Sequence, residues 1–168
     1  LLFNSILDPD PVIFLEHRWL HNTIGEVSKE VIKAIGKASI LRKGSEITII
    51  SMSYLTIESL RAADYLKLKG LEVEVIDLCS VKPIDWKLIF SSIKKTGRLI
   101  VCDTGFKTCS VSAEIIAEVS SELFNLLKAP PIRLAMHDVP EPTSFGLTKG
   151  FYTRAGDIAL KCLQIMNM

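Results

Sequence analysis

The sequence predicts an α/β protein of three layers, in which a mostly parallel five-stranded sheet with one antiparallel strand lies between two layers of helices. Two observations lead to this prediction. From residue 36 onward, short runs rich in Val, Ile and Leu alternate with segments of helical periodicity, and strands separated by helices of this length need right-handed crossovers in a parallel sheet. Apolar residues also make up 48% of the 168 residues, which suits a sheet covered on both faces.

Five segments have the composition of strands. Three of them are near-continuous apolar runs typical of buried parallel strands, and the full set is 37–41, 46–51, 72–78, 98–103 and 131–136. The first two are joined only by RKGS at 42–45, and a turn this short forces the strands that it joins to run antiparallel. The sequence therefore predicts that the sheet begins with an antiparallel pair.

Four helices are predicted around these strands, at 56–69, 86–95, 111–128 and 155–166. Gly70 stands where the C-terminal cap of the first belongs. The second follows Asp85, a good N-cap, and stops at Gly97. The third ends before two consecutive prolines, and the fourth follows the polar loop HDVPEPTSFGLTKG.

Residues 1–35 do not share this alternation. LLFNSIL (1–7) is typical of the last turns of a helix, and PVIFLEHRWL (11–20) of a strand running into a loop. An unpaired strand is costly, so we expect it to contact another chain or a domain absent here. Residues 1–21 then read as the tail of a preceding domain, 22–35 as a linker, and 36–168 as a domain of their own.

Charge and hydropathy argue against two classes of partner. Twenty basic and nineteen acidic residues give a net charge of +1 without a basic stripe, so we expect no nucleic acid. The apolar runs are much shorter than the roughly 18 residues that a membrane span needs, so we expect no membrane. No secretory signal is visible, and the four cysteines never form a CxxC pair. We therefore expect reduced thiols in the cytoplasm, or in the mitochondrial matrix of a eukaryote.

Several polar residues fall at or just past the carboxyl ends of predicted strands, which is where open α/β sheets bind ligands. Acids and an imidazole in such a place could perform acid–base chemistry or hold a metal. The acids could instead cap helices or pair with loop backbone, and this is the interpretation that we favour. The candidate ligand or partner edge consists of Asp77, Asp103, Lys107, His137 and Asp138. No catalytic, cofactor-binding or metal-binding residue is assigned.

Two other patterns point to sites less well. The stretch after the strand at 98–103 has a single glycine, Gly105, where a dinucleotide fingerprint needs three and a Walker loop needs Gly-Lys followed by Ser or Thr. Lys107 and the start of the next helix could still hold an anion, but the main role predicted for Gly105 is to turn the strand into the helix. His17 and His21 have helical zinc spacing, yet Arg18 stands where metalloproteases have Glu.

Three segments, taken in order, carry a family resemblance: LEVEVIDLCSVKPIDWKLIFSSIKKTGRLIVCD (71–103), SVSAEIIAEV (110–119) and HDVPEPTS (137–144). They resemble the C-terminal domain of the β subunit of thiamine-diphosphate-dependent 2-oxo acid dehydrogenases, in the transketolase superfamily. NSILDPDPVIFLEHRWL (4–20) is similar to the end of the preceding pyrimidine-binding domain, and IGKASILRKGSEITIIS (35–51) to the entry into the C-terminal one. The matching residues are Asp77, Pro83, Asp85, Gly97, Ala113-Glu114-Ile115 and Asp138-Val139-Pro140.

The resemblance implies an assembly domain of an enzyme that decarboxylates a 2-oxo acid and passes the acyl group to a lipoyl carrier. It implies thiamine diphosphate and Mg²⁺ in the full enzyme, with none bound by this chain alone. The implied partners are a second β chain, an α subunit or equivalent diphosphate domain, and a lipoyl acyltransferase core. The chain departs from the family at Cys79, where Arg is usual, and at 109–112, where the approach to the helix is usually richer in glycine.

Two alternatives remain open. The chain could be the C-terminal domain of another transketolase-superfamily enzyme, or a free-standing small-molecule binder that uses the edge of the sheet. For association, Phe145, Phe151 and Tyr152 suggest an apolar contact surface, although these rings could instead pack beneath their own loop. We expect a dimer.

Overall fold

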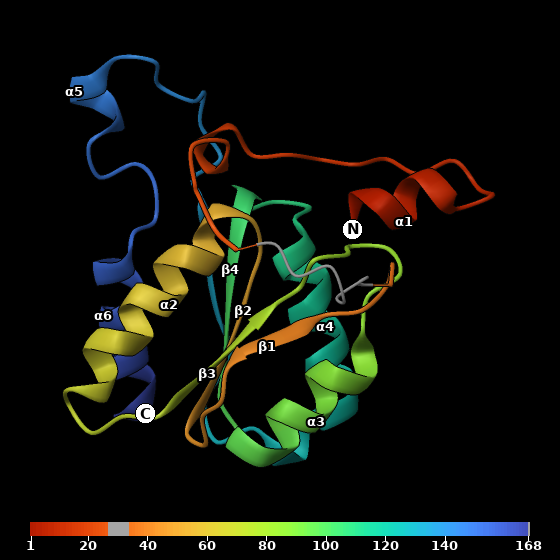
Figure 1. Ribbon diagram of the computed structural model, residues 1–168. Coiled ribbons are helices and arrows are strands. Elements are labelled where there is room, and N and C mark those ends of the chain that lie inside the picture. The colour runs from red at the N-terminus through yellow and green to blue at the C-terminus, as the bar shows by residue number, and fades with distance from the viewer. Residues whose placement is uncertain (27–33, 168) are drawn as a thin grey trace.

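The computed structural model describes residues 1–26 and 34–167, and its centre is a five-stranded sheet between two helical layers (Figure 1). In spatial order the strands run β1-β3-β2-β4-β5, and every neighbouring pair is parallel except β1 with β3. Their bounds are Ser39–Arg42 (β1), Ile47–Ser51 (β2), Val73–Asp77 (β3), Leu99–Phe106 (β4) and Ile132–Met136 (β5). The predicted fold class is confirmed.

Two pairs of helices cover the faces of the sheet. On one face lie α2 (Tyr54–Lys67) and α6 (Ala155–Met166), and on the other lie α3 (Trp86–Thr96) and α4 (Val111–Leu123) (Figure 1). The predicted third helix, 111–128, is shorter than expected, because the α-helix ends at Leu123 and a 3₁₀ turn, Phe124–Leu126, follows. The caps are confirmed at Asp85, which accepts the N–H of Leu88, and at Gly97, which has φ +71°.

The hydrophobic core is divided by the sheet into two clusters, as alternation along a strand requires. Ile49 packs beneath α2 and α6, whereas the next residue, Ile50, packs beneath α3 and α4. Both side chains are fully buried, and each such side chain contributes roughly 1.5–3 kcal/mol through burial. The near-continuous apolar runs in the sequence arise because both faces of these strands are covered.

The first strand pairs differently from the prediction. Its orientation is antiparallel as expected, but β1 pairs with β3 and not with β2. The short connection crosses β3, and the N–H groups of Ser45 and Glu46 both donate to the carbonyl of Glu72 at 3.1 Å. At Gly44 the crossing is so close that a Cβ would lie 2.2 Å from the carbonyl carbon of Val73. The short turn fixes the direction of β1 relative to β2, whereas the close approach at Gly44 allows β3 to lie between them as the neighbour of β1.

The N-terminal segment contains a helix where predicted, α1 (Leu2–Leu7), but no strand forms within 11–20. A strand needs a partner for its backbone groups, and no described strand pairs with this segment. A 3₁₀ turn, η1 (Arg18–Leu20), lies at its end. The predicted linker 22–35 falls partly on 27–33, outside the described residues. None of the described helices is long and apolar enough to cross a membrane.

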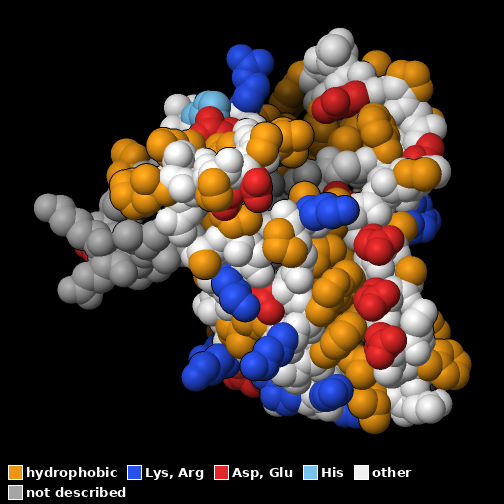
Figure 2. All heavy atoms as spheres, turned by 90° about the vertical axis from the view of Figure 1, so that its right-hand side faces the viewer, with side chains coloured by type: hydrophobic (Ala, Val, Ile, Leu, Met, Phe, Trp, Pro, Cys, Tyr) orange, Lys and Arg blue, Asp and Glu red, His pale blue; other side chains and the backbone are white. Residues whose placement is uncertain are grey.

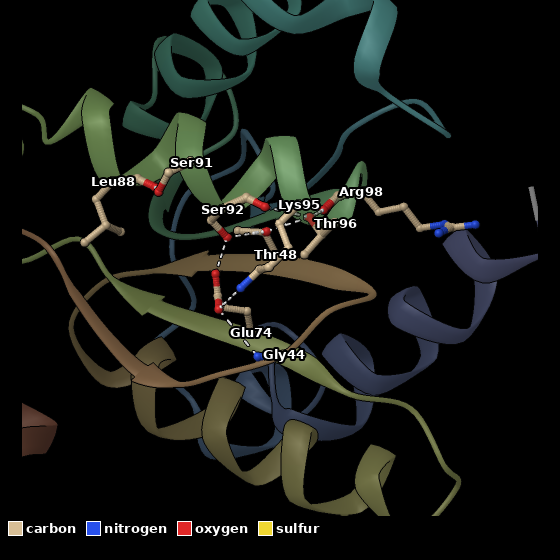
Figure 3. A network of polar contacts seen from close by, with 9 residues as sticks. All are labelled: Gly44, Thr48, Glu74, Leu88, Ser91, Ser92, Lys95, Thr96 and Arg98. Atoms are coloured by element: carbon tan, nitrogen blue, oxygen red, sulfur yellow. Dashed lines mark hydrogen bonds and ion pairs between the residues drawn. The ribbon is translucent and has the colours of Figure 1, made fainter.

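A buried polar network joins the sheet to α3 (Figure 3). Glu74 on β3 is 1% exposed, and its carboxylate accepts hydrogen bonds from the hydroxyl of Ser92 and the ammonium of Lys95. The hydroxyl of Thr48 on β2 lies 2.6 Å from that of Ser92 and 2.8 Å from that of Thr96. Because these buried oxygens satisfy one another, the polar layer is compatible with the surrounding core.

Candidate functional site

The five residues of the predicted edge do not come together as one site. Asp77 ends β3, Asp103 lies within β4, Lys107 follows β4, and His137 and Asp138 follow β5. Strand β2 lies between β3 and β4, so Asp77 stands apart from the residues on β4 and β5. The neighbouring strands β4 and β5 bring together only the loops that carry Lys107 and Asp138.

Asp103 ties the loop after β4 to the start of α4. Its side chain is buried, and its two oxygens accept the backbone N–H groups of Gly105 and Ser112, each at 2.8 Å. The alternative reading of this acid, as a partner of loop backbone, therefore describes its contacts. Two donors that could have met a phosphate are already engaged.

The turning role predicted for Gly105 is wrong. Strand β4 continues through Gly105 to Phe106, with an irregular register against β5. The left-handed backbone falls instead at Cys109, where φ is +56°. A single glycine does not locate the end of a strand. Glycine can also adopt the extended backbone of a strand, and the strand then continues where a partner strand is present.

Asp138 fastens the same loop to the end of β5. Its carboxylate accepts the backbone N–H of Thr108 at 3.0 Å and the hydroxyl of Thr108 at 2.8 Å. These two hydrogen bonds lower the pKa of Asp138, and the positive charges of Lys107 and Arg133 add to the effect. The guanidinium of Arg133 also donates to the carbonyl of Lys107 at 3.0 Å, so the β4–α4 loop is held by a clamp of charged and polar groups.

An open groove of about 440 Å³ lies beside this clamp, between α4 and β5. Its lining is Lys107, Arg133, Ala113, Ile116, Ala117 and Pro131. The two cations could attract an anion, but none of these side chains is a nucleophile or general base at neutral pH. A second groove of about 430 Å³ runs between α2 and α6 and is lined chiefly by Ala, Leu and Tyr side chains.

Asp77 takes part in a different set of contacts. Its carboxylate accepts hydrogen bonds from the thiol of Cys79 at 2.8 Å and from the hydroxyl of Thr56 at 3.4 Å. At the position where the resembling family usually has Arg, this chain thus places a thiol directly on the carboxylate. Cys79 holds φ at +57°, a conformation that costs roughly 1–2 kcal/mol for a residue other than glycine.

Left-handed backbone recurs at this edge in a way that sequence reasoning missed. Ser53 after β2, Cys79 after β3 and Cys109 after β4 all have φ between +56° and +57°. Such residues cluster at functional sites in proteins. No sequence signal could have revealed them, because the glycine or asparagine that usually marks this conformation is absent at all three positions.

The histidine pair does not form a metal site. Nδ1 of His17 accepts the N–H of Trp19 at 3.3 Å, and Nε2 of His21 lies 3.4 Å from a carboxylate oxygen of Glu16. Across residues 1–26 and 34–167 there is no group of three or more His, Cys, Asp or Glu side chains that could hold a metal ion. Desolvation by burial lowers the pKa of His17.

Two cysteines lie in the hydrophobic core. Cys102 on β4 and Cys162 on α6 are both fully buried, and burial raises the pKa of each thiol to about 12. Cys109 is exposed. The buried thiols remain protonated in the folded chain and serve as small apolar side chains.

The aromatic residues of the predicted contact surface have different environments. Phe145 on the short helix α5 (Phe145–Thr148) is 89% exposed. Phe151 and Tyr152 are half-buried and meet edge to face, with ring centroids 5.2 Å apart. Tyr152 also contacts Trp19, a residue that the sequence did not mark as important.

Comparison with known proteins places this fold in a family. The sequence model described as "Transketolase, C-terminal domain" matches residues 36–155. The mitochondrial pyruvate dehydrogenase E1 component subunit beta-1 of Arabidopsis thaliana is 40% identical over 154 residues, which cover 89% of this chain and 42% of the relative. Pyruvate dehydrogenase E1 component subunit beta of Bacillus subtilis is 38% identical over 146 residues, covering 86% and 45%. The chain spans less than half the length of these two relatives.

Among solved structures, an inactive β4 tetramer of a split-gene transketolase has the same fold. It superposes with a TM-score of 0.73 at 22% identity, over 84% of this chain and 45% of that one. The sequence match over 36–155 covers well over half of the chain. The chain therefore belongs to the family of transketolase C-terminal domains, and its relatives include β subunits of the pyruvate dehydrogenase E1 component.

Proposed function

We propose that this chain provides the C-terminal domain of the β subunit of a thiamine-diphosphate-dependent 2-oxo acid dehydrogenase, which decarboxylates a 2-oxo acid and passes the acyl group to a lipoyl carrier. The observation that carries the proposal is the 40% identity to a pyruvate dehydrogenase β subunit over 89% of the chain. We infer that the domain serves subunit association, and that the groups that activate the cofactor belong to other parts of the enzyme.

Thiamine diphosphate and Mg²⁺ would be cofactors of the full enzyme, and the described residues of this chain do not fit them. Mg²⁺ with a diphosphate needs carboxylate ligands beside phosphate-binding donors. The described residues offer no cluster of three candidate metal ligands. At the start of α4 the N–H groups of Ser112 and Ala113 already donate to Asp103 and Ser110. No catalytic step is assigned to this chain.

Exposed apolar side chains support a role in association. Figure 2 views the side that carries α1 and shows hydrophobic side chains gathered over the N-terminal segment. Ile6 is 72% exposed, Ile13 87% and Leu15 84%. Exposed apolar side chains gathered in this way are typical of contact sites in proteins. In the proposed enzyme it would face a second β chain, the α subunit or another domain of the same subunit.

The acyltransferase core and the compartment follow from the same proposal. A lipoyl acyltransferase core would receive the acyl group. Relatives from plants are mitochondrial by name, so the mitochondrial matrix is the proposed compartment in a eukaryote and the cytoplasm in a bacterium.

Two measurements test the proposal. The tagged chain 1–168 is mixed with a pyruvate dehydrogenase E1 α subunit and passed over an affinity column, and CO₂ release from pyruvate is followed with thiamine diphosphate and Mg²⁺. We expect co-elution with the α subunit and no CO₂ release by the chain alone. Decarboxylation by the chain alone would refute the assignment of catalysis to other parts of the enzyme.

A matched pair of variants locates the contact. Ile13→Asp introduces a charge on the exposed apolar N-terminal segment, and Leu68→Asp does so at a residue of similar exposure at the end of α2. We expect the first to weaken co-elution and the second to leave it unchanged. Equal co-elution of both variants, or none by the unaltered chain, would remove the proposed contact surface.

A further inference from the structure

Trp19 lies where three segments that are distant in sequence meet. Its ring packs edge to face on Tyr54, the first residue of α2, with centroids 4.8 Å apart. It also packs edge to face on Tyr152, at 5.0 Å. The guanidinium of Arg154 stands 4.8 Å above the same ring, within the range of a cation–π contact. One indole thus contacts the α2 terminus and the end of the loop 137–154.

Further contacts hold the chain around Trp19 against the domain. The ring of His17 lies 4.6 Å from that of Tyr54, and Leu20 packs against the core cluster under α2 and α6. Residues 17–20 are therefore docked, whereas the side chains of 11–16 are exposed. Figure 1 shows this turn beside the end of the sheet where α2 begins.

The residues that contact the Trp19 ring from its two sides are held in place by different contacts. Tyr54 is 6% exposed and belongs to the core. On the other side of the ring, the hydroxyl of Tyr152 donates to the carboxylate of Glu141, and the backbone N–H of Arg154 donates to the carboxylate of Asp157 at 2.9 Å, at the start of α6. Tyr152 thus links the indole to the far part of its own loop, whose helix α5 exposes Phe145 and Leu147.

We propose that Trp19 is an intramolecular latch that fastens residues 1–21 to the domain and couples their position to the loop 137–154. This connection is non-covalent and separate from the linker 22–35. The latch consists of contacts within the chain and does not depend on the proposed function. Because coupling between two sites is reciprocal, an event that displaces Tyr152 or Arg154 frees Trp19, and the release of Trp19 frees the loop.

Trp19 can report on the latch by its own fluorescence. The sequence has two tryptophans, so Trp86→Phe leaves Trp19 as the single emitter in the chain 1–168. In this background Arg154→Ala and Tyr152→Ala should each raise the acrylamide quenching constant about twofold, since each removes a group that covers one part of an indole already 45% exposed. Tyr152→Phe, which keeps the ring, should leave the constant unchanged.

Phe124→Ala is the matched control, because it truncates an aromatic residue that is 72% exposed, on the turn η2. If acrylamide quenches Trp19 in Arg154→Ala and Tyr152→Ala no more strongly than in Phe124→Ala, the latch does not exist.

Hydrogen exchange tests the reverse direction of the coupling. Trp19→Ala should speed backbone exchange in 139–154 several-fold while α3, on the other face of the sheet, exchanges at its former rate. Unchanged exchange in the loop would overturn the coupling. Faster exchange throughout the chain, α3 included, would show that Trp19 is an ordinary core residue and would also overturn the proposal.

Discussion

The carboxylate of Glu58 on α2 accepts a hydrogen bond from the backbone N–H of Ala155 at 2.9 Å, although 97 residues separate the two. Its other oxygen accepts from Arg61 at 2.7 Å. Ala155 is the first residue of α6, and the first N–H groups of a helix have no partner within it. Glu58 therefore caps one helix from another and fixes the contact between α2 and α6.

Glu58→Ala should destabilise the chain. The substitution leaves the N–H of Ala155 without its acceptor and removes a side chain that is 7% exposed. An unsatisfied buried group typically costs about 1–3 kcal/mol, and we expect a loss of free energy of unfolding in this range by urea denaturation. Glu122→Ala, on the exposed surface of α4, should change it by less than about 0.5 kcal/mol. Equal effects of the two variants would contradict the capping role.

The network around Glu74 gives a second prediction. Removing the carboxylate alone should cost more stability than replacing Glu74 and Lys95 together by apolar residues. Glu74→Ala leaves the hydroxyl of Ser92 and the ammonium of Lys95 without their acceptor. Since Lys95 is about half exposed, water takes up part of the loss, and we expect about 2–3 kcal/mol of destabilisation.

The double variant Glu74→Leu with Lys95→Met should recover much of this loss, because a well-packed apolar pair can replace a buried ion pair. Urea denaturation of both variants provides the measurement, with Glu72→Ala as an exposed neighbour that should be neutral. A double variant less stable than Glu74→Ala would show that the network depends on charge and not on packing.

Gly44→Ala tests the crossing of the β1–β2 connection over β3. The added Cβ would lie 2.2 Å from a backbone carbon of Val73 and 2.3 Å from the backbone nitrogen of Glu74. Backbone cannot move aside as a flexible side chain does, so we expect a loss of about 1–3 kcal/mol or more. Gly25→Ala meets no atom within 4 Å and should be neutral. Matching thermal midpoints for the two variants would mean that the crossing is not tight.

Alkaline pH should weaken the fold. Burial raises the pKa of Cys102 and of Cys162 from 9.0 to about 12, and that of Tyr54 from 10.0 to about 12. In the unfolded chain these groups ionise at their ordinary pKa, so unfolding releases protons above pH 9. The stability that they confer is fully present below pH 9 and falls as the pH rises toward 12.

A pair of core variants isolates the contribution of one thiol. Cys162→Val removes an ionisable group, whereas Ile165→Val shortens a neighbouring core side chain on the same helix without removing one. Between pH 9 and 12, the free energy of unfolding should fall less steeply in Cys162→Val than in Ile165→Val. Parallel slopes would show that the buried thiol does not contribute to the pH dependence.

The elements of the fold could be predicted from the sequence because their signals are local. Apolar runs, helical periodicity, the N-cap Asp85 and the C-cap Gly97 act over a few residues, and both caps lie where predicted. The candidate edge was only partly predictable. Asp77 ends β3 and Asp138 follows β5, as expected, but Asp103 lies within β4. Asp103 and Asp138 hold loop backbone, and Asp77 is kept apart from them by β2.

The fold class, the order of strands and helices from residue 36 onward, and the family could be inferred from the sequence. Three contacts became clear only in the folded chain: β1 pairs with β3 across Gly44, Glu58 caps α6, and Trp19 joins the N-terminal turn to the loop 137–154. The difference lies in how far apart in sequence the interacting residues are. Hydrophobic periodicity and capping arise from interactions between residues three or four apart, whereas these three contacts join residues from about thirty to more than a hundred positions apart, and folding alone brings them within reach.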